Sequence, residues 1–370
     1  MRTLGTLALL SILPSVISAV AGPAILQPNR TTDVLDRYER GNRDEVAREL
    51  ASVQDVPAFA RDLQRLGTPW VGALGPAQAH RRKLVAASVA LEVAAPRFWP
   101  EEVDPLVEWG CQLIRNDAQR DDGERLWFRA SVAIFGRARD DGRLVTRAGP
   151  GAALGQLLVP APRAADHIAH ALQQWPDEDR FKLAAAMQIA VTADSEPPHD
   201  VPWVKTDAIS RDSQEGRRRA RAGKAIEMFD DLLRIPSLRA EASVRKGYLQ
   251  LTLNQLQDAL LSFASGGETD DTFVVYLARF LAGRTFDRMG QRENANEKYR
   301  LALRTIPDAQ SANEALSANL FLLGQPDEAY AHARAALSSR TAAEDPWHEF
   351  GYGDRRLIPS LMTQLREAIR

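Results

Sequence analysis

Residues 286–307 read FDRMGQRENANEKYRLALRTIP, two helix-like pieces that meet at Gly290. Glycine readily adopts the left-handed backbone that closes a helix, so we place the turn between the two helices at Gly290. Proline lacks the amide proton that a helix interior needs, so Pro307 ends the second helix. The stretch therefore predicts a pair of helices joined by a short turn.

The pair fits a frame of 34 residues, 276–309, in which small and aromatic residues occupy fixed positions. Gly283 in the first helix and Ala295 in the second are small enough for the two helices to approach closely. Tyr299 is expected to fill the gap beside them, and Ala302 to let the next pair pack. Such a frame is typical of a repeated structural unit.

The frame recurs along the C-terminal half of the chain. Gly324 follows Gly290 by 34 residues, and Gly247 precedes Gly283 by 36 residues. Each unit carries an alanine at the same place in its second helix, and these residues are Ala225, Ala259, Ala295 and Ala329. The frame departs from the usual pattern at Ser317, where a glycine is common, and it lacks a tryptophan at its fourth position. Four units in register predict an array rather than unrelated helices.

On these residues the chain resembles the tetratricopeptide-repeat (TPR) family over roughly residues 178–340. It is most similar to the divergent TPR proteins that bacteria export to the cell envelope. The resemblance implies an all-α fold, an α-solenoid of stacked antiparallel helix pairs that forms a TPR-like superhelix. Residues 38–53 contain a turn at Gly41-Asn42 and fit a degenerate repeat. We therefore expect the N-terminal half to continue the same array.

The chain divides into five expected segments. They are a signal peptide (1–21), a region of degenerate helical repeats (22–192), a Pro-rich loop (193–216), the TPR repeats (217–340) and a C-terminal capping helix (341–370). The last helix is expected to cover the exposed end of the solenoid with one apolar face, made of Leu357, Leu361, Leu365 and Ile369.

The first residues have the features of a secretory signal peptide. Arg2 supplies a positive charge, and the stretch Leu4–Ile17 is apolar apart from a break at Pro14. Cleavage is expected after Ala21, so that the mature protein begins at Gly22 and is periplasmic or extracellular. A retained membrane anchor is the alternative, because the sequence is apolar from about Leu4 to Ile25, which is long enough to span a bilayer.

Composition restricts the class of partner. The net charge is −2, so no strong attraction to nucleic acid or anionic lipid is expected. The basic run GRRRARAGK, Gly216–Lys224, is interpreted as the solvated face of a helix.

Cys111 is the single cysteine, which excludes an internal disulfide, and its apolar surroundings predict a buried side chain.

No catalytic, metal or cofactor site is predicted. His167 and His170 share one helix face, but the sequence places no third ligand with them. His348-Glu349 lacks the second histidine of a zinc-protease motif, and the Gly-rich stretch 148–155 lacks the spacing of a phosphate-binding loop.

The family resemblance implies a concave groove lined by the first helix of each repeat, and in many members this groove binds a peptide or a partner helix. Carried over position by position, the groove residues are Val244, Tyr248, Leu251, Phe280, Arg284, Asp287, Glu314, Ala318 and Phe321. The basic-plus-Asn clamp that some members use for a terminal carboxylate is not visible at these positions. The leading hypothesis is a non-catalytic scaffold of the bacterial cell envelope that binds a protein or peptide partner.

Two alternatives remain open. An enzyme, or an enzyme subunit, would have its site in the N-terminal half, near Trp99, Trp109, Trp127 and His167. A carbohydrate- or lipid-binding solenoid would use the same tryptophans for stacking, although such residues more often fill helix–helix cores. The identity of the partner and the oligomeric state do not follow from the sequence.

Overall fold

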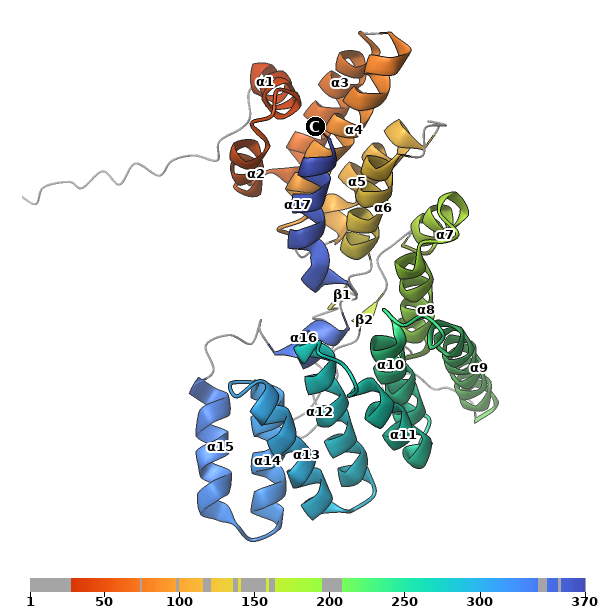
Figure 1. Ribbon diagram of the computed structural model, residues 1–370, viewed down its shortest axis with the longest axis vertical. Coiled ribbons are helices and arrows are strands. Elements are labelled where there is room, and N and C mark those ends of the chain that lie inside the picture. Colours follow the sequence, from red (N-terminus) through yellow and green to blue (C-terminus); the bar gives the residue numbers. More distant parts are fainter. Residues whose placement is uncertain are drawn as a thin grey trace, which may run out of the picture.

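The computed structural model describes residues 28–73, 75–97, 100–115, 121–135, 139–140, 158–159, 164–194, 208–338, 345–351 and 354–369. The expected signal peptide, Trp99 and the Gly-rich stretch 148–155 lie outside these residues. The described chain is helical except for one pair of two-residue strands (Figure 1). None of its helices is both long and apolar enough to cross a membrane.

The N-terminal half is a cluster of helices. Its elements are α1 (Pro28–Glu39), α2 (Arg43–Ala51), α3 (Val56–Gly72), α4 (Pro76–Ala94), α5 (Pro100–Ile114) and α6 (Asp122–Phe135). Strand β1 (Arg139–Asp140) then pairs antiparallel with β2 (Leu158–Val159). Helix α4 contacts each of the other five helices in the cluster, and residues 84–94 of α4 are all buried. The expected continuous array is therefore wrong here, because a helix that is covered on all sides sits inside a cluster and not in a stack.

The C-terminal half is the predicted α-solenoid. Its elements are α7 (Ala164–Gln174), α8 (Asp179–Asp194), α9 (Ala208–Leu232), α10 (Arg239–Thr252), α11 (Leu256–Gly266), α12 (Thr272–Arg288), α13 (Arg292–Thr305), α14 (Gln310–Leu322) and α15 (Pro326–Ser338). Helices α8 to α15 pack as the successive pairs α8/α9, α10/α11, α12/α13 and α14/α15, and each pair stacks on the next (Figure 1). The described chain closes with α16 (Pro346–Phe350), a short 3₁₀ turn (Arg355–Leu357) and α17 (Ile358–Ala368).

Packing inside the pairs follows the repeat register. The four second-helix alanines, Ala225, Ala259, Ala295 and Ala329, are buried. A Cβ atom on Gly283 would lie 2.5 Å from the ring of Tyr299, and one on Gly247 would lie 2.7 Å from the ring of Phe263. In these two pairs the glycine of the first helix thus makes room for the aromatic ring of the second, as the sequence predicts.

The turns inside the last three pairs share one backbone conformation. Gly290 and Gly324 have φ of +74° and +75°, and Asn254 takes the same place in the preceding pair with φ of +63°. The amide of the next residue donates five residues back in each turn, as in Gln291 N to Phe286 O at 2.9 Å. The turn at Gly41 between α1 and α2 is of the same kind, with φ of +109°. Asparagine tolerates this conformation better than most residues, which explains a turn that a search for glycine overlooks.

The predicted Pro-rich loop, 193–216, is wrong over part of its length. Helix α8 continues to Asp194, and α9 already begins at Ala208. The stretch 208–216 lacks proline, and several of its residues are good helix formers, so helix propensity there outweighs its polar composition.

The predicted role of the last helix as an end cap is also wrong. The apolar face of α17, including Leu361 and Leu365, is buried in the N-terminal cluster, where α17 packs on α6 (Figure 1). Arg366 of α17 pairs with the buried Glu92 of α4 at 2.7 Å. Helix α17 therefore does not cover the end of the solenoid, where Leu337 of α15 is 86% exposed and Phe321 of α14 is 60% exposed.

The close approach at Gly283 gives a first prediction. Gly283→Ala is expected to destabilise the fold by about 1–3 kcal/mol, because the added methyl group overlaps the ring of Tyr299. The matched control is Gly223→Ala in α9, where a Cβ atom meets nothing within 4 Å. The control is expected to stabilise the chain by about 0.5–1 kcal/mol through helix propensity. Urea unfolding followed by circular dichroism measures both variants, and equal midpoints would contradict the packing account.

Candidate functional site

A short segment of the same chain occupies part of the predicted groove. Helix α16 packs against α12, and its Trp347 lies among aromatic rings of the repeats. The ring centroid of Trp347 is 5.8 Å from that of Tyr248 on α10 and 5.6 Å from that of Phe280 on α12. The guanidinium carbon of Arg284 lies 5.4 Å from the Trp347 ring centroid, a distance typical of a cation–π contact.

Phe350 is the second aromatic anchor of α16. Its ring is buried, stacks on Trp347 at 5.7 Å and meets Tyr248 edge-on at 5.3 Å. Arg245 of α10 places its guanidinium carbon 4.8 Å from the ring centroid, and its Nη1 donates to the Phe350 carbonyl at 3.1 Å. One arginine of the groove therefore binds both the side chain and the backbone of this residue.

The start of α16 is fixed by Asp345, which is almost completely buried. One carboxylate oxygen accepts the amide of Trp347 at 2.9 Å and so caps α16. The other accepts the amide of Ser311, in the first turn of α14, at 2.7 Å. Burial and the nearby Asp345 charge together raise the pKa of Tyr276. The cap of α16 is thus shared with the N-terminus of a repeat helix.

A buried carboxylate beside α16 joins three parts of the chain. Glu241 of α10 pairs with Arg245 at 2.9 Å, with Arg180 of α8 at 2.9 Å and with Arg356, beyond α16, at 3.6 Å. Burial by itself raises the pKa of Glu241, but the charges of Arg245, Arg180 and Arg356 outweigh it and lower that pKa to about 2. Asp354 belongs to the same group through Arg180 at 3.3 Å, and burial raises its pKa.

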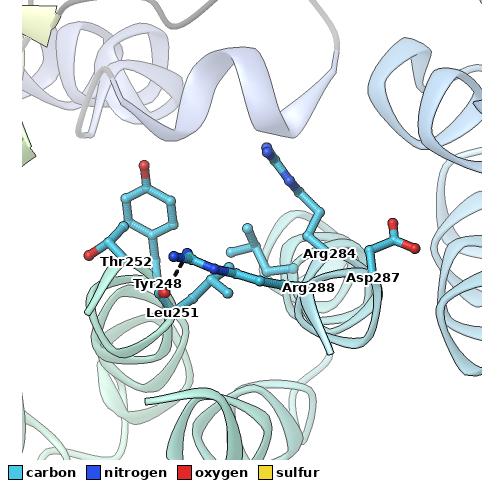
Figure 2. A pocket seen from close by; sticks show the side chains of 7 residues that line it. Tyr248, Leu251, Thr252, Arg284, Asp287 and Arg288 are labelled. Carbon is cyan, nitrogen blue, oxygen red and sulfur yellow. Dashed lines mark hydrogen bonds between the residues drawn. The ribbon is translucent and has the colours of Figure 1, made fainter. Parts of the chain in front are cut away.

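An open pocket of about 470 Å³ lies between α10 and α12, next to α16 (Figure 2). Figure 2 shows Arg284 pointing toward the C-terminal segment, whereas Arg288 crosses the floor and donates to the Leu251 carbonyl at 3.0 Å. The complete lining is Tyr248, Leu251, Thr252, Leu281, Arg284, Asp287 and Arg288. The pocket therefore combines an apolar wall with two guanidinium groups.

The charge balance of the pocket is positive. Asp287 accepts hydrogen bonds from the hydroxyl of Tyr299 and the side-chain amide of Asn319, so both of its oxygens are engaged within the repeats. Burial and that hydrogen bond raise the pKa of Tyr299. Among the described residues, Arg284 has no ion pair. An incoming carboxylate would therefore meet Arg284 without competition from Asp287.

The structure divides the predicted groove residues into three sets. Tyr248, Leu251, Arg284 and Asp287 line the open pocket. Val244 and Phe280 are buried, Phe280 directly beneath Trp347. The remaining residues are solvent-exposed on α14, away from the pocket, and are Glu314, Ala318 and Phe321.

Sequence reasoning missed three lining residues and the segment that occupies the groove. Thr252, Leu281 and Arg288 lie one position away from predicted residues, where the crossing of α10 and α12 turns them inward. The stretch DPWHEF carried a usable signal, because an Asp-Pro helix start is followed by aromatic residues three positions apart.

Three residues of the alternative sites, His167 of α7, Trp109 of α5 and Trp127 of α6, are buried. His167 is buried, 2.7 Å from Ser131 Oγ and stacked on Phe128, and burial lowers its pKa to about 3. Trp109 and Trp127 are buried, so neither offers a face to a sugar. No group of three His, Cys, Asp or Glu residues in the described ranges could hold a metal ion.

Cys111 is buried, as the sequence predicts, and burial raises the pKa of its thiol to about 11. A thiol with such a pKa stays protonated at neutral pH, so it packs as a small apolar side chain.

Comparison with known proteins gives only distant matches. No family model matches the chain, and no curated protein matches it. A crystal structure of MamA is similar, with 16% identity and a TM-score of 0.35, over 48% of this chain and 86% of that one. MamA residues 41 to the end, from Desulfovibrio magneticus RS-1, has 15% identity and a TM-score of 0.37, over 61% and 99% of the two chains. The chain is a TPR-like α-solenoid on the evidence of its own helix pairs.

The buried ion cluster gives a second prediction. The pKa of Glu241 is lower in the folded chain than the value of about 4.3 expected when unfolded, so its contribution to stability is complete above about pH 5 and lost as the pH falls toward 2. Glu241→Gln is expected to cost about 3–5 kcal/mol at neutral pH, because Arg245, Arg180 and Arg356 each lose an ion pair with Glu241.

The measurement is urea unfolding of both proteins between neutral pH and pH 2. Asp354 is present in both proteins, so the difference between their free energies of unfolding reports chiefly the ionisation of Glu241. This difference in free energy should shrink as the pH falls. The exposed Glu314→Gln variant is the control and should stay within about 0.5 kcal/mol of the wild type at every pH. A difference in free energy of unfolding between the wild type and Glu241→Gln that does not change with pH would contradict the conclusion that Glu241 is charged within the folded chain.

Proposed function

We propose that this protein is a non-catalytic scaffold that binds a peptide or a helix of a partner protein in the groove between α10 and α12. The observation that carries the proposal is α16, which lies in that groove through aromatic, cation–π and backbone contacts of the kind a bound peptide makes. The groove is not filled, since the pocket beside α16 is open.

The pocket favours an acidic partner. Arg284 and Arg288 supply positive charge, and Leu251, Leu281 and the ring of Tyr248 supply apolar surface. A carboxylate next to an apolar or aromatic side chain complements both features. Because Arg284 is exposed, its attraction for a carboxylate is screened by salt, so binding should weaken as the ionic strength rises.

Selection from a library of random displayed peptides tests the proposal. The wild-type chain is expected to enrich peptides that carry Asp or Glu close to an aromatic or aliphatic residue. Arg284→Glu reverses the charge of the pocket and should abolish that enrichment. Arg334→Glu makes the same change on the exposed face of α15 and should leave it intact. Failure to enrich any sequence class, or enrichment that survives Arg284→Glu, would refute the proposed site.

The place of action is part of the proposal. Residues 1–21 have the charge, apolar stretch and small-residue end of a signal peptide, which supports export to the bacterial envelope or beyond. In an expressing bacterium, the protein recovered from the periplasm or the medium is expected to begin at Gly22 by intact-mass measurement. Recovery of the full-length chain from the membrane fraction would favour the anchor instead.

A further inference from the structure

We propose that α16 is an exchangeable ligand in cis, and that the partner carries the same recognition chemistry. That chemistry is one helical turn that begins with an acidic capping residue and presents two aromatic side chains three positions apart. A segment of this kind displaces α16 and binds where α16 now lies, on the surface formed by α10, α12 and the start of α14. This surface is called the seat of α16. The inference rests on the proposed function, since it specifies the partner of the same groove and what controls access to it.

The repeats supply the receiving side of three anchors of α16, Asp345, Trp347 and Phe350, whereas the ion pair of Glu349 with Arg355 at 3.1 Å lies within the C-terminal segment. The carboxylate of Asp345 is bound by the amide of Ser311 at the start of α14. Trp347 lies between rings of α10 and α12, and Phe350 lies against Arg245. None of these contacts depends on the covalent link between α16 and the rest of the chain. A free segment with the same three groups therefore meets the same seat.

The helical form of α16 depends on its surroundings. A helix of five residues is far too short to persist alone in water, so the Asp345 cap and the packing of its two aromatic rings impose its conformation. Without the seat the segment loses its helix, and the same cost of ordering falls on any competitor. Exchange between α16 and a competitor is therefore decided by the contacts each makes with the groove.

The rest of the C-terminal segment is fastened independently of α16. Arg356 pairs with Asp271, the capping residue of α12, at 2.9 Å. Helix α17 is buried in the N-terminal cluster, with Arg366 bound to Glu92 at 2.7 Å. These contacts involve neither Trp347 nor Phe350. Helix α16 can therefore leave its seat while the residues on its C-terminal side stay in place.

Arg284 gives a partner the means to compete with a tethered segment. Its guanidinium lies over Trp347 and also lines the open pocket, so the seat and the pocket are continuous. A short tether holds α16 at an effective concentration of the order of mM, which a free peptide with only the aromatic pair does not overcome. A partner that adds a carboxylate in the pocket gains contacts that α16 does not make.

The test uses a fluorescent peptide with the sequence of residues 345–351, DPWHEFG, and the full chain. Anisotropy titration is expected to show at least about ten-fold tighter binding to the double variant Trp347→Ala/Phe350→Ala than to the wild type, because the competitor in cis has lost its anchors. A peptide with alanine at both aromatic positions should not bind. The control variant Tyr330→Ala/Leu337→Ala changes two exposed side chains of α15 and should behave as wild type.

Equal affinity of the double variant and the wild type, with the helical circular-dichroism signal preserved, would overturn the proposal. If the double variant loses that signal, hydrogen exchange on the wild-type chain decides. Peptide at a concentration well above the effective concentration of the tether, which is of the order of mM, should then accelerate exchange at residues 345–351 and leave α17 unchanged, and no acceleration would overturn the proposal. A peptide that binds the double variant, together with a display selection that enriches nothing, would retain the exchange of α16 and reject the proposed function.

Discussion

A single buried carboxylate determines how the parts of this chain are held together. Glu241 is buried, with 7% of its surface exposed, and a buried charge without partners is very unfavourable. Its partners come from α8, from α10 itself and from the segment after α16, which are far apart in sequence. Ion clusters of this kind add less to stability than to specificity, because only one arrangement of the three parts satisfies the charge. The position of α16 over the groove follows from that arrangement.

The groove has two neighbouring regions as a result. The aromatic region, around Trp347, is filled by the chain itself. The basic region, at Arg284 and Arg288, is open to a second molecule. Arg284 belongs to both, so any change in one region alters the electrostatics of the other. A TPR-like array without such a segment would present a single uninterrupted surface.

Local rules in the sequence were sufficient to predict the helix pairs. The spacing of Gly283, Tyr299 and Ala295 reflects contacts between neighbouring helices, and such contacts repeat with the frame. The same register identified four of the seven residues of the pocket, since a helix face is periodic. Whether Thr252, Leu281 and Arg288 line the pocket depends on how α10 and α12 cross, and this crossing does not follow from the repeat register. The places where α16 and α17 pack depend on contacts with helices far away in the sequence. An apolar face such as that of α17 must be covered by another helix, but the face does not specify which helix covers it.

The return of α17 to the N-terminal cluster affects the order in which the chain is built. Helix α17 supplies Leu361 and Leu365 to a core whose other walls come chiefly from α1 to α6, with smaller contributions from α7 and α8. During synthesis those six helices emerge first and lack one wall until α17 has left the ribosome. The repeats, in contrast, contact mainly their neighbours in sequence and need nothing that comes much later. The N-terminal half is thus made before the repeats but completed after them, and it exposes apolar surface until α17 has been synthesised.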